Sequence, residues 1–549
     1  MYTISKTYVS SFGDRIPVAH FRHSFADLLD LFAEFRDLLK PELIDGVPNF
    51  TQAAMARQHE DLKGLQERLA GLEISDWSIA DRVDYHVVRA EMNAADFDHR
   101  VLKPWARDPG FYNLTDGIYP RLLVHHSRSL SNWGLVQPGL PLDEDGVADF
   151  HNRLRCIPDL FAQAQENLIE ASAELATIAI RVKEKDIELL QRFRTGFAEH
   201  HATLVEDVDA AIAATEGFRD WLIANRDRMT APAGIGKENY NWWMKNVHLI
   251  PYTWDQFHTM IQTEYNRAVT FLKLEQNKNR RLPEFALTAS EEENHRRQQE
   301  SVTKLMQFLR DEEIITVPPD LEPLPPDQYP RVWGISAYLR PDDRGFFEET
   351  NDREPMTNVA HVFFGHYYVG GRKIWYQKSD NRPIRGAIRL YDLHEARSEA
   401  LAFGIEEWLL QAGLFDDRPR SREITYIWSI FRAVRALADL KMHANDYSLD
   451  DGLNSISANV PNAWAEADSD AVWWDTEEAL RAPGHSSNYV VGRNMIQGLM
   501  AERAQQLGNK FSVRDFFDEF MSAGIVPISL TRWELTGRDD QMTQLLDET

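Results

Sequence analysis

The stretch SFADLLDLFAEFRDLLK, residues 24–40, carries apolar side chains at steps of three and four residues. This spacing places them on one face of an α-helix and the charged residues on the other. A strand would instead alternate at every second residue, so the pattern predicts an amphipathic helix that packs against a core. The apolar positions are Phe25, Leu28, Leu29, Phe32, Phe35 and Leu39.

The same periodicity predicts a mainly α-helical protein. Comparable stretches cover 51–72, 79–103, 144–174 and 190–227. Two later helix starts fit the capping-box pattern, in which a hydroxyl residue is followed three positions on by Glu or Gln. These pairs are Thr253 with Gln256, and Ser290 with Glu293.

Several segments interrupt the helical pattern. Residues 317–330, VPPDLEPLPPDQYP, cannot be helical because each proline lacks the N–H donor and restricts the residue before it. Residues 331–340 are predicted to be a short strand or an extended segment. Irregular sequence also fills 104–143, and later breaks are expected at 368–386, 416–423, 444–475 and 481–487. The predicted organisation is an N-terminal helical scaffold (1–316), a proline-rich boundary with the strand (317–355) and a C-terminal helical half that carries the site (356–549).

Composition excludes some classes of partner. The 549 residues include 60 Lys and Arg against 86 Asp and Glu, a formal net charge of −26. No basic stripe is present, so we expect no nucleic-acid partner and no binding to anionic membranes. No window approaches the roughly 20 apolar residues of a membrane span, and the N-terminus does not resemble a secretory signal. A cytoplasmic protein is expected.

A single cysteine, Cys156, excludes an intramolecular disulfide and any site built from several cysteines. Cys156 lies in a helical pattern, so a half-buried structural role is favoured over a nucleophile.

Residues 357–368, TNVAHVFFGHYY, contain two histidines among apolar residues. His361 and His366 are five residues apart, about 140° on an ideal α-helix, so they do not share a face. Gly365 could end or distort the helix and bring them together. Two interpretations stay open, a metal site or a buried helix with two hydrogen-bonded histidines.

Two further patches concentrate charged residues. In 390–408, Glu395 and Glu399 share a face with Asp392 and Glu406. Such a stripe is usually solvated, but the Ala, Leu, Phe and Gly around it indicate partial burial, and a buried carboxylate must be paired or bound to a metal. Residues 429–444 carry a polar stripe with two interpretations. It is either a surface ladder of ion pairs, or a place where Asp439 orients the His443 imidazole for acid–base catalysis. Its members are Arg432, Arg435, Asp439 and His443.

These patches resemble the motifs of the DUF885 family, helical proteins related to gluzincin-type zinc peptidases. The family motifs HExxPGHH, EGWALYAE, RAxRLVVDTGIH, PGQxxSY and GxLPL correspond in order to AHVFFGHYY, SEALAFGIEEW, RAVRALADLKMH, PGHSSNYVVG and FFDEFMSAGIVPISL. Residues 81–113 and 241–268 also resemble family segments. The resemblance implies a large helical gluzincin-like fold with a central cleft and only a few short strands near the site.

The first motif departs from the family. Aligned on Gly365 and His366, the first zinc-binding histidine falls on Ala360 and the catalytic glutamate falls on His361. Glu399 is kept, the four residues of the polar stripe and Tyr489 match, and the glutamine of PGQ is His485. A zinc peptidase needs three ligands and a carboxylate base, so ordinary peptide hydrolysis is disfavoured. Two states remain: one Zn²⁺ held by His361, His366 and Glu399, or a metal-free cleft.

We therefore expect an enzyme, a lyase that decarboxylates or otherwise cleaves a C–C bond in a small, aromatic, carboxylate-bearing substrate. The alternatives are a zinc-dependent amidohydrolase or peptidase with rebuilt ligands, and a non-catalytic binding protein. No cofactor motif is present, so the cofactor is none or one Zn²⁺. The partner is a small molecule, and a homo-oligomer is left open.

The resemblance and the residue chemistry together assign roles. The expected acid–base groups are His361, His366, Asp439, His443 and Tyr489. The expected substrate-binding residues are Arg432, Arg435, Phe363, Phe364 and His485. Other aromatic residues near the motif either line the pocket or pack in the core; these are Trp333, Tyr367, Tyr368, Trp375 and Tyr376.

Overall fold

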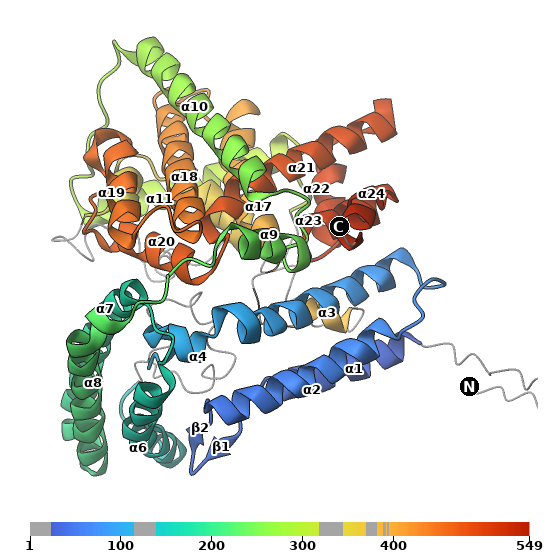
Figure 1. The fold of residues 1–549 in the computed structure, drawn as a ribbon. Helices are drawn as coiled ribbons and strands as arrows, with labels where there is room; N and C mark the ends of the chain where they lie inside the picture. Colours follow the sequence, from blue (N-terminus) through green and yellow to red (C-terminus); the bar gives the residue numbers. More distant parts are fainter. Residues whose placement is uncertain are drawn as a thin grey trace, which may run out of the picture.

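The computed structural model describes residues 24–114, 139–317, 344–368, 382–387, 391, 393 and 395–547, and most of these residues are helical (Figure 1). The α- and π-helices described before residue 317 are α1 (Phe25–Leu38), α2 (Gln52–Ala70), α3 (Ile79–Phe97), the π-helix η1 (Asp98–Leu102), α4 (Pro104–Arg107), α6 (Glu144–Asn167), α7 (Ala173–His200), α8 (Val205–Asn225), α9 (Lys237–Asn246), α10 (Trp254–Asn279) and α11 (Glu291–Asp311).

The helices of the second part carry the candidate site. They are α13 (Phe346–Arg353), α14 (Met356–Val359), the π-helix η6 (Ala360–Tyr368), α16 (Pro383–Gly386), α17 (Glu395–Gln411), α18 (Ser421–His443), α19 (Leu449–Asn459), α20 (Asp470–Arg481), α21 (His485–Leu507), α22 (Val513–Ser522), α23 (Ile528–Thr536) and α24 (Asp540–Leu546).

The mainly helical class is confirmed. In the described ranges the strands are β1 (Leu43–Ile44) and β2 (Val47–Pro48), an antiparallel pair. This pair lies beside α2 and α6 in the lower part of Figure 1, and the strand predicted near the site stays a prediction. The predicted strand 331–340 falls outside the described residues, as do Trp333, Trp375 and Tyr376.

The local signals for helices are mostly confirmed. α1 buries Leu28, Phe32 and Phe35 on the predicted face and begins with a capping box at Ser24. The predicted box at Thr253 is present. At Ser290 only half of it forms, because the Glu293 carboxylate accepts the N–H of Ala289, at 2.8 Å, rather than that of Ser290.

Three predicted ranges are wrong in detail. The stretch 144–174 is divided between α6 and α7, and Ser172, in the segment that connects them, forms a β-bridge with Thr230. The stretch 190–227 breaks at His201, whose Nε2 accepts the N–H of Leu142 at 2.7 Å. The expected break 444–475 contains α19, because Leu449, Leu453 and Ile456 supply a buried helical face.

Two hydrophobic cores hold the described residues together. The smaller core lies within residues 47–229, among α6, α7, α8 and the start of α2, and includes the buried Cys156. Burial raises the pKa of the Cys156 thiol, which supports the structural role. The larger core draws on residues from both sides of the predicted boundary at 317. The division into domains at 317 and 355 stays a prediction.

Helix α18 lies at the centre of the larger core, and nearly all of its side chains are buried. It packs along α10, which comes from the N-terminal part, and against α21; α21 in turn packs along α17 (Figure 1). The polar residues of α17, α18 and α21 are therefore brought together inside the protein. No helix among the described residues is long and apolar enough to cross a bilayer.

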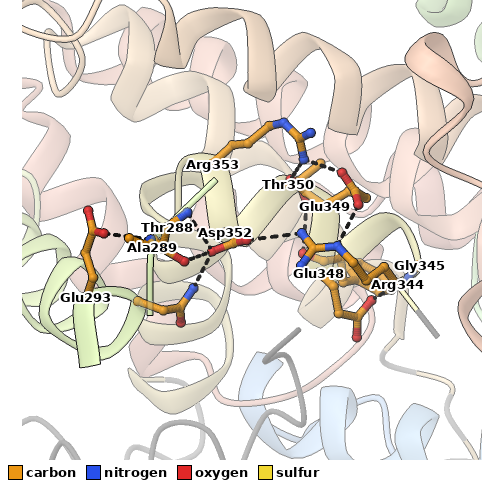
Figure 2. Close-up of polar contacts among 12 residues, drawn as sticks. Thr288, Ala289, Glu293, Arg344, Gly345, Glu348, Glu349, Thr350, Asp352 and Arg353 are labelled. Carbon is orange, nitrogen blue, oxygen red and sulfur yellow. Dashed lines mark hydrogen bonds and ion pairs between the residues drawn. The ribbon is translucent and has the colours of Figure 1, made fainter. Parts of the chain in front are cut away.

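A buried polar network fixes α13, the helix that precedes the candidate site (Figure 2). The Asp352 carboxylate accepts hydrogen bonds from Thr288 and from Asn294 (3.2 Å), which lie at the start of α11. Arg344 bonds Asp352 at 3.1 Å and Glu349 at 2.8 Å. These bonds tie α13 to α11 just before the chain enters α14 and η6.

Candidate metal centre

The two histidines of the first patch lie on a π-helix. Its i→i+5 hydrogen bonds place residues five apart one turn from each other, whereas an α-helix separates them. Residues 360–368 adopt this conformation, and the rings of His361 and His366 meet with their centroids 4.8 Å apart. The distortion considered from the sequence is therefore present and brings the pair together.

Gly365 allows this π-helix to approach α17. A methyl group at Gly365 would lie 2.3 Å from Cβ of Ala402, well inside van der Waals contact. Ala402 follows Glu399 by three residues, so the close approach sets the histidine pair beside Glu399. The glycine is required by packing between helices, which a local sequence pattern does not reveal.

Three ligand atoms converge at this contact. The Nε2 atoms of His361 and His366 are 3.1 Å apart, and Oε2 of Glu399 lies 3.8 Å and 3.4 Å from them. Atoms bound at about 2.0–2.2 Å to a tetrahedral zinc ion lie about 3.3–3.6 Å from one another. The separation of His366 from Glu399 lies in this range, and the other two, 3.1 and 3.8 Å, lie about 0.2 Å below and above it, so small side-chain movements would bring the trio to three corners of a zinc tetrahedron. His361 and Glu399 are buried, and the His366 side chain is 19% exposed, which leaves an approach from solvent.

A second layer of polar residues orients His361. Its Nδ1 lies 2.9 Å from Oε1 of Glu406, and Arg432 Nη2 lies 2.9 Å from that oxygen and 3.1 Å from Nδ1. A carboxylate is a stronger acceptor than an imidazole nitrogen, so both groups donate to Glu406. The lone pair of Nε2 is then directed at the other ligand atoms, as in carboxylate–histidine–zinc arrangements. Burial raises the pKa of Glu406 to about 7, although Arg432 acts to lower it.

The acidic stripe of 390–408 is buried rather than solvated. Glu395, Glu399 and Glu406 are all less than 6% exposed, and Asp392 lies outside the described residues. The sequence indicated that a buried carboxylate here needs a partner. It did not separate the candidate ligand, Glu399, from Glu406, whose partners lie 26 and 45 positions away.

The two arginines expected to bind substrate lie buried against protein carboxylates. Arg432 bonds Glu406, and Arg435 bonds Asp475. The Tyr489 ring contacts both guanidinium groups, with centroid distances of 4.9 Å to Arg432 and 4.2 Å to Arg435. These contacts support an internal, positioning role for both arginines, and substrate binding by them stays a prediction.

Asp439 and His443 are also completely buried. Asp439 accepts the N–H groups of Ser487 (2.9 Å) and Gly484 (3.4 Å) at the start of α21, and burial raises its pKa to about 7. His443 Nε2 donates to the carbonyl of Ala479 at 2.8 Å and lies 3.7 Å from Asp439. Burial lowers the pKa of His443 to about 4, so it is neutral at pH 7. The two residues join α18 to α20 and α21, and their catalytic role stays a prediction.

The remaining residues expected to bind substrate lie in two different environments. Phe363 and Phe364 are buried in the larger core, where the ring of Phe364 meets Phe517 at 5.6 Å. His485 lies between Glu395 and Glu478. The sequence gave no sign of Glu478.

Comparison with known protein families shows to which family the chain belongs. A model described as "Bacterial protein of unknown function (DUF885)" matches residues 41–345 and 403–535. The chain belongs to the DUF885 family. The match is interrupted over 346–402, the range that contains His361, His366 and Glu399. The ligand assignment in this DUF885 protein therefore rests on its own geometry.

Two solved structures share the fold. One is described as "a putative lipoprotein of unknown function" from Shewanella oneidensis, with 16% identity, a TM-score of 0.67, and coverage of 93% of this chain and 98% of that one. The other, "the putative lipoprotein from Colwellia psychrerythraea", has 14% identity, a TM-score of 0.68, and coverage of 94% and 99%. Identities this low support a common fold alone. No curated protein matches.

Proposed function

We propose that this DUF885 protein is a zinc-dependent amidohydrolase whose ligands are His361, His366 and Glu399. The observation that carries the proposal is the convergence of their three ligand atoms, whose separations of 3.1, 3.4 and 3.8 Å are close to those around a tetrahedral ion. Bound zinc would polarise a carbonyl oxygen and lower the pKa of a coordinated water toward neutrality.

The chain's own residues prepare the site. Glu406 fixes the tautomer and orientation of His361, and Arg432 holds Glu406. The partial exposure of His366 supports an open coordination position on the solvent side. Position 361, which carries the base in the family motif, is here a ligand, so no carboxylate base is assigned at that position.

The amide class follows from the resemblance to gluzincin-type zinc peptidases. A metal-free lyase stays the alternative, but the two guanidinium groups that it requires for the substrate carboxylate are engaged by Glu406 and Asp475. A binding protein without turnover is the third outcome that the experiment below distinguishes.

The test compares the wild type with His366→Ala and with His59→Ala as a matched control. The side chains of His366 and His59 are equally exposed, at 19%. After zinc loading and desalting, metal content is measured by mass spectrometry. We expect His366→Ala to lose one equivalent of zinc and His59→Ala to lose none; equal zinc content in all three proteins would contradict the proposal.

Turnover is then followed on a panel of fluorogenic dipeptides and N-acyl amino acids, with and without a chelator. Hydrolysis that the chelator abolishes and zinc restores supports the hydrolase. Zinc binding without hydrolysis would leave a binding protein, and release of CO₂ from aromatic acids by the metal-free protein would favour the lyase.

A further inference from the structure

A second cluster of ligand-type residues lies where three helices meet. Glu395 is the first residue of α17, His485 is the first residue of α21, and Glu478 lies on α20. All three are at most 5% exposed, and one ligand atom from each lies within 4.8 Å of the others. The cluster is thus enclosed by protein, unlike the first, which His366 opens to solvent.

The two nitrogens of His485 have different surroundings. Nδ1 lies 2.5 Å from Oε1 of Glu395, the distance of a hydrogen bond rather than of two ligands on one ion. Nδ1–H therefore donates to Glu395, and in the neutral imidazole Nε2 carries the lone pair. This Nε2 is buried, makes no hydrogen bond within the described part of the chain, and faces Oε2 of Glu478 at 3.4 Å.

In a dry interior, an imidazole nitrogen that faces a carboxylate oxygen at this distance calls for either a proton or a bound cation between the two atoms. The separation of 3.4 Å equals the edge of a tetrahedron around an ion bound at about 2.1 Å. The arrangement also repeats that of His361, where a carboxylate holds Nδ1 and Nε2 points toward a second carboxylate.

We propose that His485 and Glu478, with Glu395 oriented behind the imidazole, form a second divalent-cation site. An imidazole nitrogen beside carboxylates suits Zn²⁺ or Mn²⁺, whereas Mg²⁺ and Ca²⁺ take oxygen ligands. The ion joins the start of α21 to α20. The next turns of α17 and α21 carry Glu399 and Tyr489, so the ion stabilises the frame of the first site without belonging to it. The proposal is independent of the hydrolase.

The test counts ions in proteins stripped with a chelator, reloaded with Zn²⁺ or Mn²⁺ and desalted. His485→Gln keeps a hydrogen-bond donor but removes the ring nitrogen, and Glu478→Gln removes the charge. The matched control is His248→Gln, another buried histidine outside both clusters. We expect two ions per chain in the wild type and the control, one in each cluster variant, one in His366→Ala, and none in His366→Ala combined with His485→Gln.

The two proposals fail separately. A single ion that is lost in His366→Ala and kept in His485→Gln overturns the second site and leaves a protonated imidazole between two carboxylates. A single ion with the opposite behaviour overturns the hydrolase and keeps the second site. If the cluster variants do not fold, anomalous diffraction at the manganese edge from wild-type crystals decides: a peak beside His485 Nε2 supports the site, and its absence overturns it.

Discussion

Replacing Gly365 by alanine tests whether the π-helix and its contact with α17 create the metal centre. The new Cβ would lie 2.3 Å from Cβ and 2.5 Å from Cα of Ala402, while ordinary contact begins at 3.4 Å. The helices would have to separate by about 1 Å. Because Ala402 and Glu399 belong to the same helix, that movement also pulls the Glu399 carboxylate away from the histidines.

Overpacking of this kind costs typically 1–3 kcal/mol. We expect Gly365→Ala to lower the free energy of unfolding by about that amount, measured by urea denaturation of the metal-free protein. A misplaced ligand should also weaken zinc binding by about 10-fold or more, measured by competition with a chromophoric chelator.

Gly498→Ala is the control. Gly498 lies in α21, and a methyl group added there would have no neighbouring atom within 4 Å. Alanine at this position should therefore stabilise the helix by roughly 0.5–1 kcal/mol and leave zinc affinity unchanged. We therefore expect Gly365→Ala to lower the free energy of unfolding and Gly498→Ala to raise it. Wild-type stability and zinc affinity in Gly365→Ala would refute the reasoning.

Three other predictions concern buried polar groups. Glu406→Gln should weaken zinc binding by about 10–100-fold, since the amide does not hold His361 as the carboxylate does; unchanged affinity in the chelator competition would contradict this. Asp439 has a pKa of about 7 in the folded protein, above its value in the unfolded chain. Its contribution to the free energy of unfolding is therefore fully present below about pH 4 and is lost as the pH rises to about 7, by on the order of 4 kcal/mol in total. Asp439→Asn should therefore flatten the decline in unfolding free energy between pH 4 and 7, and a profile parallel to the wild type would exclude this assignment. Arg435→Met leaves the Asp475 carboxylate buried without its cation and should cost about 3–5 kcal/mol in urea denaturation, whereas a loss below about 1 kcal/mol would show that the pair is unimportant.

Much of the fold could be predicted because its signals are local. The apolar spacing of Leu28, Phe32 and Phe35 and the capping pair Thr253 and Gln256 each act within a few residues of chain. Predictions failed where a distant contact decides, as at His201, which leaves the helical conformation and accepts the N–H of Leu142, 59 positions earlier.

The candidate site was also predicted only where its signals are local in sequence. The sequence singled out His361, His366 and Glu399, but their meeting depends on a π-helix that packs through Gly365 against Ala402. Glu406 was visible only as part of an acidic stripe, and its role depends on burial. His485 was expected at the substrate, and only the tertiary packing of α17, α20 and α21 shows it between two carboxylates.

The most direct test of the metal centre is anomalous diffraction at the zinc edge from crystals of the zinc-loaded protein. The account predicts a peak about 2.0–2.2 Å from Nε2 of His361, Nε2 of His366 and Oε2 of Glu399. A zinc-loaded crystal with no peak among these three atoms would contradict it.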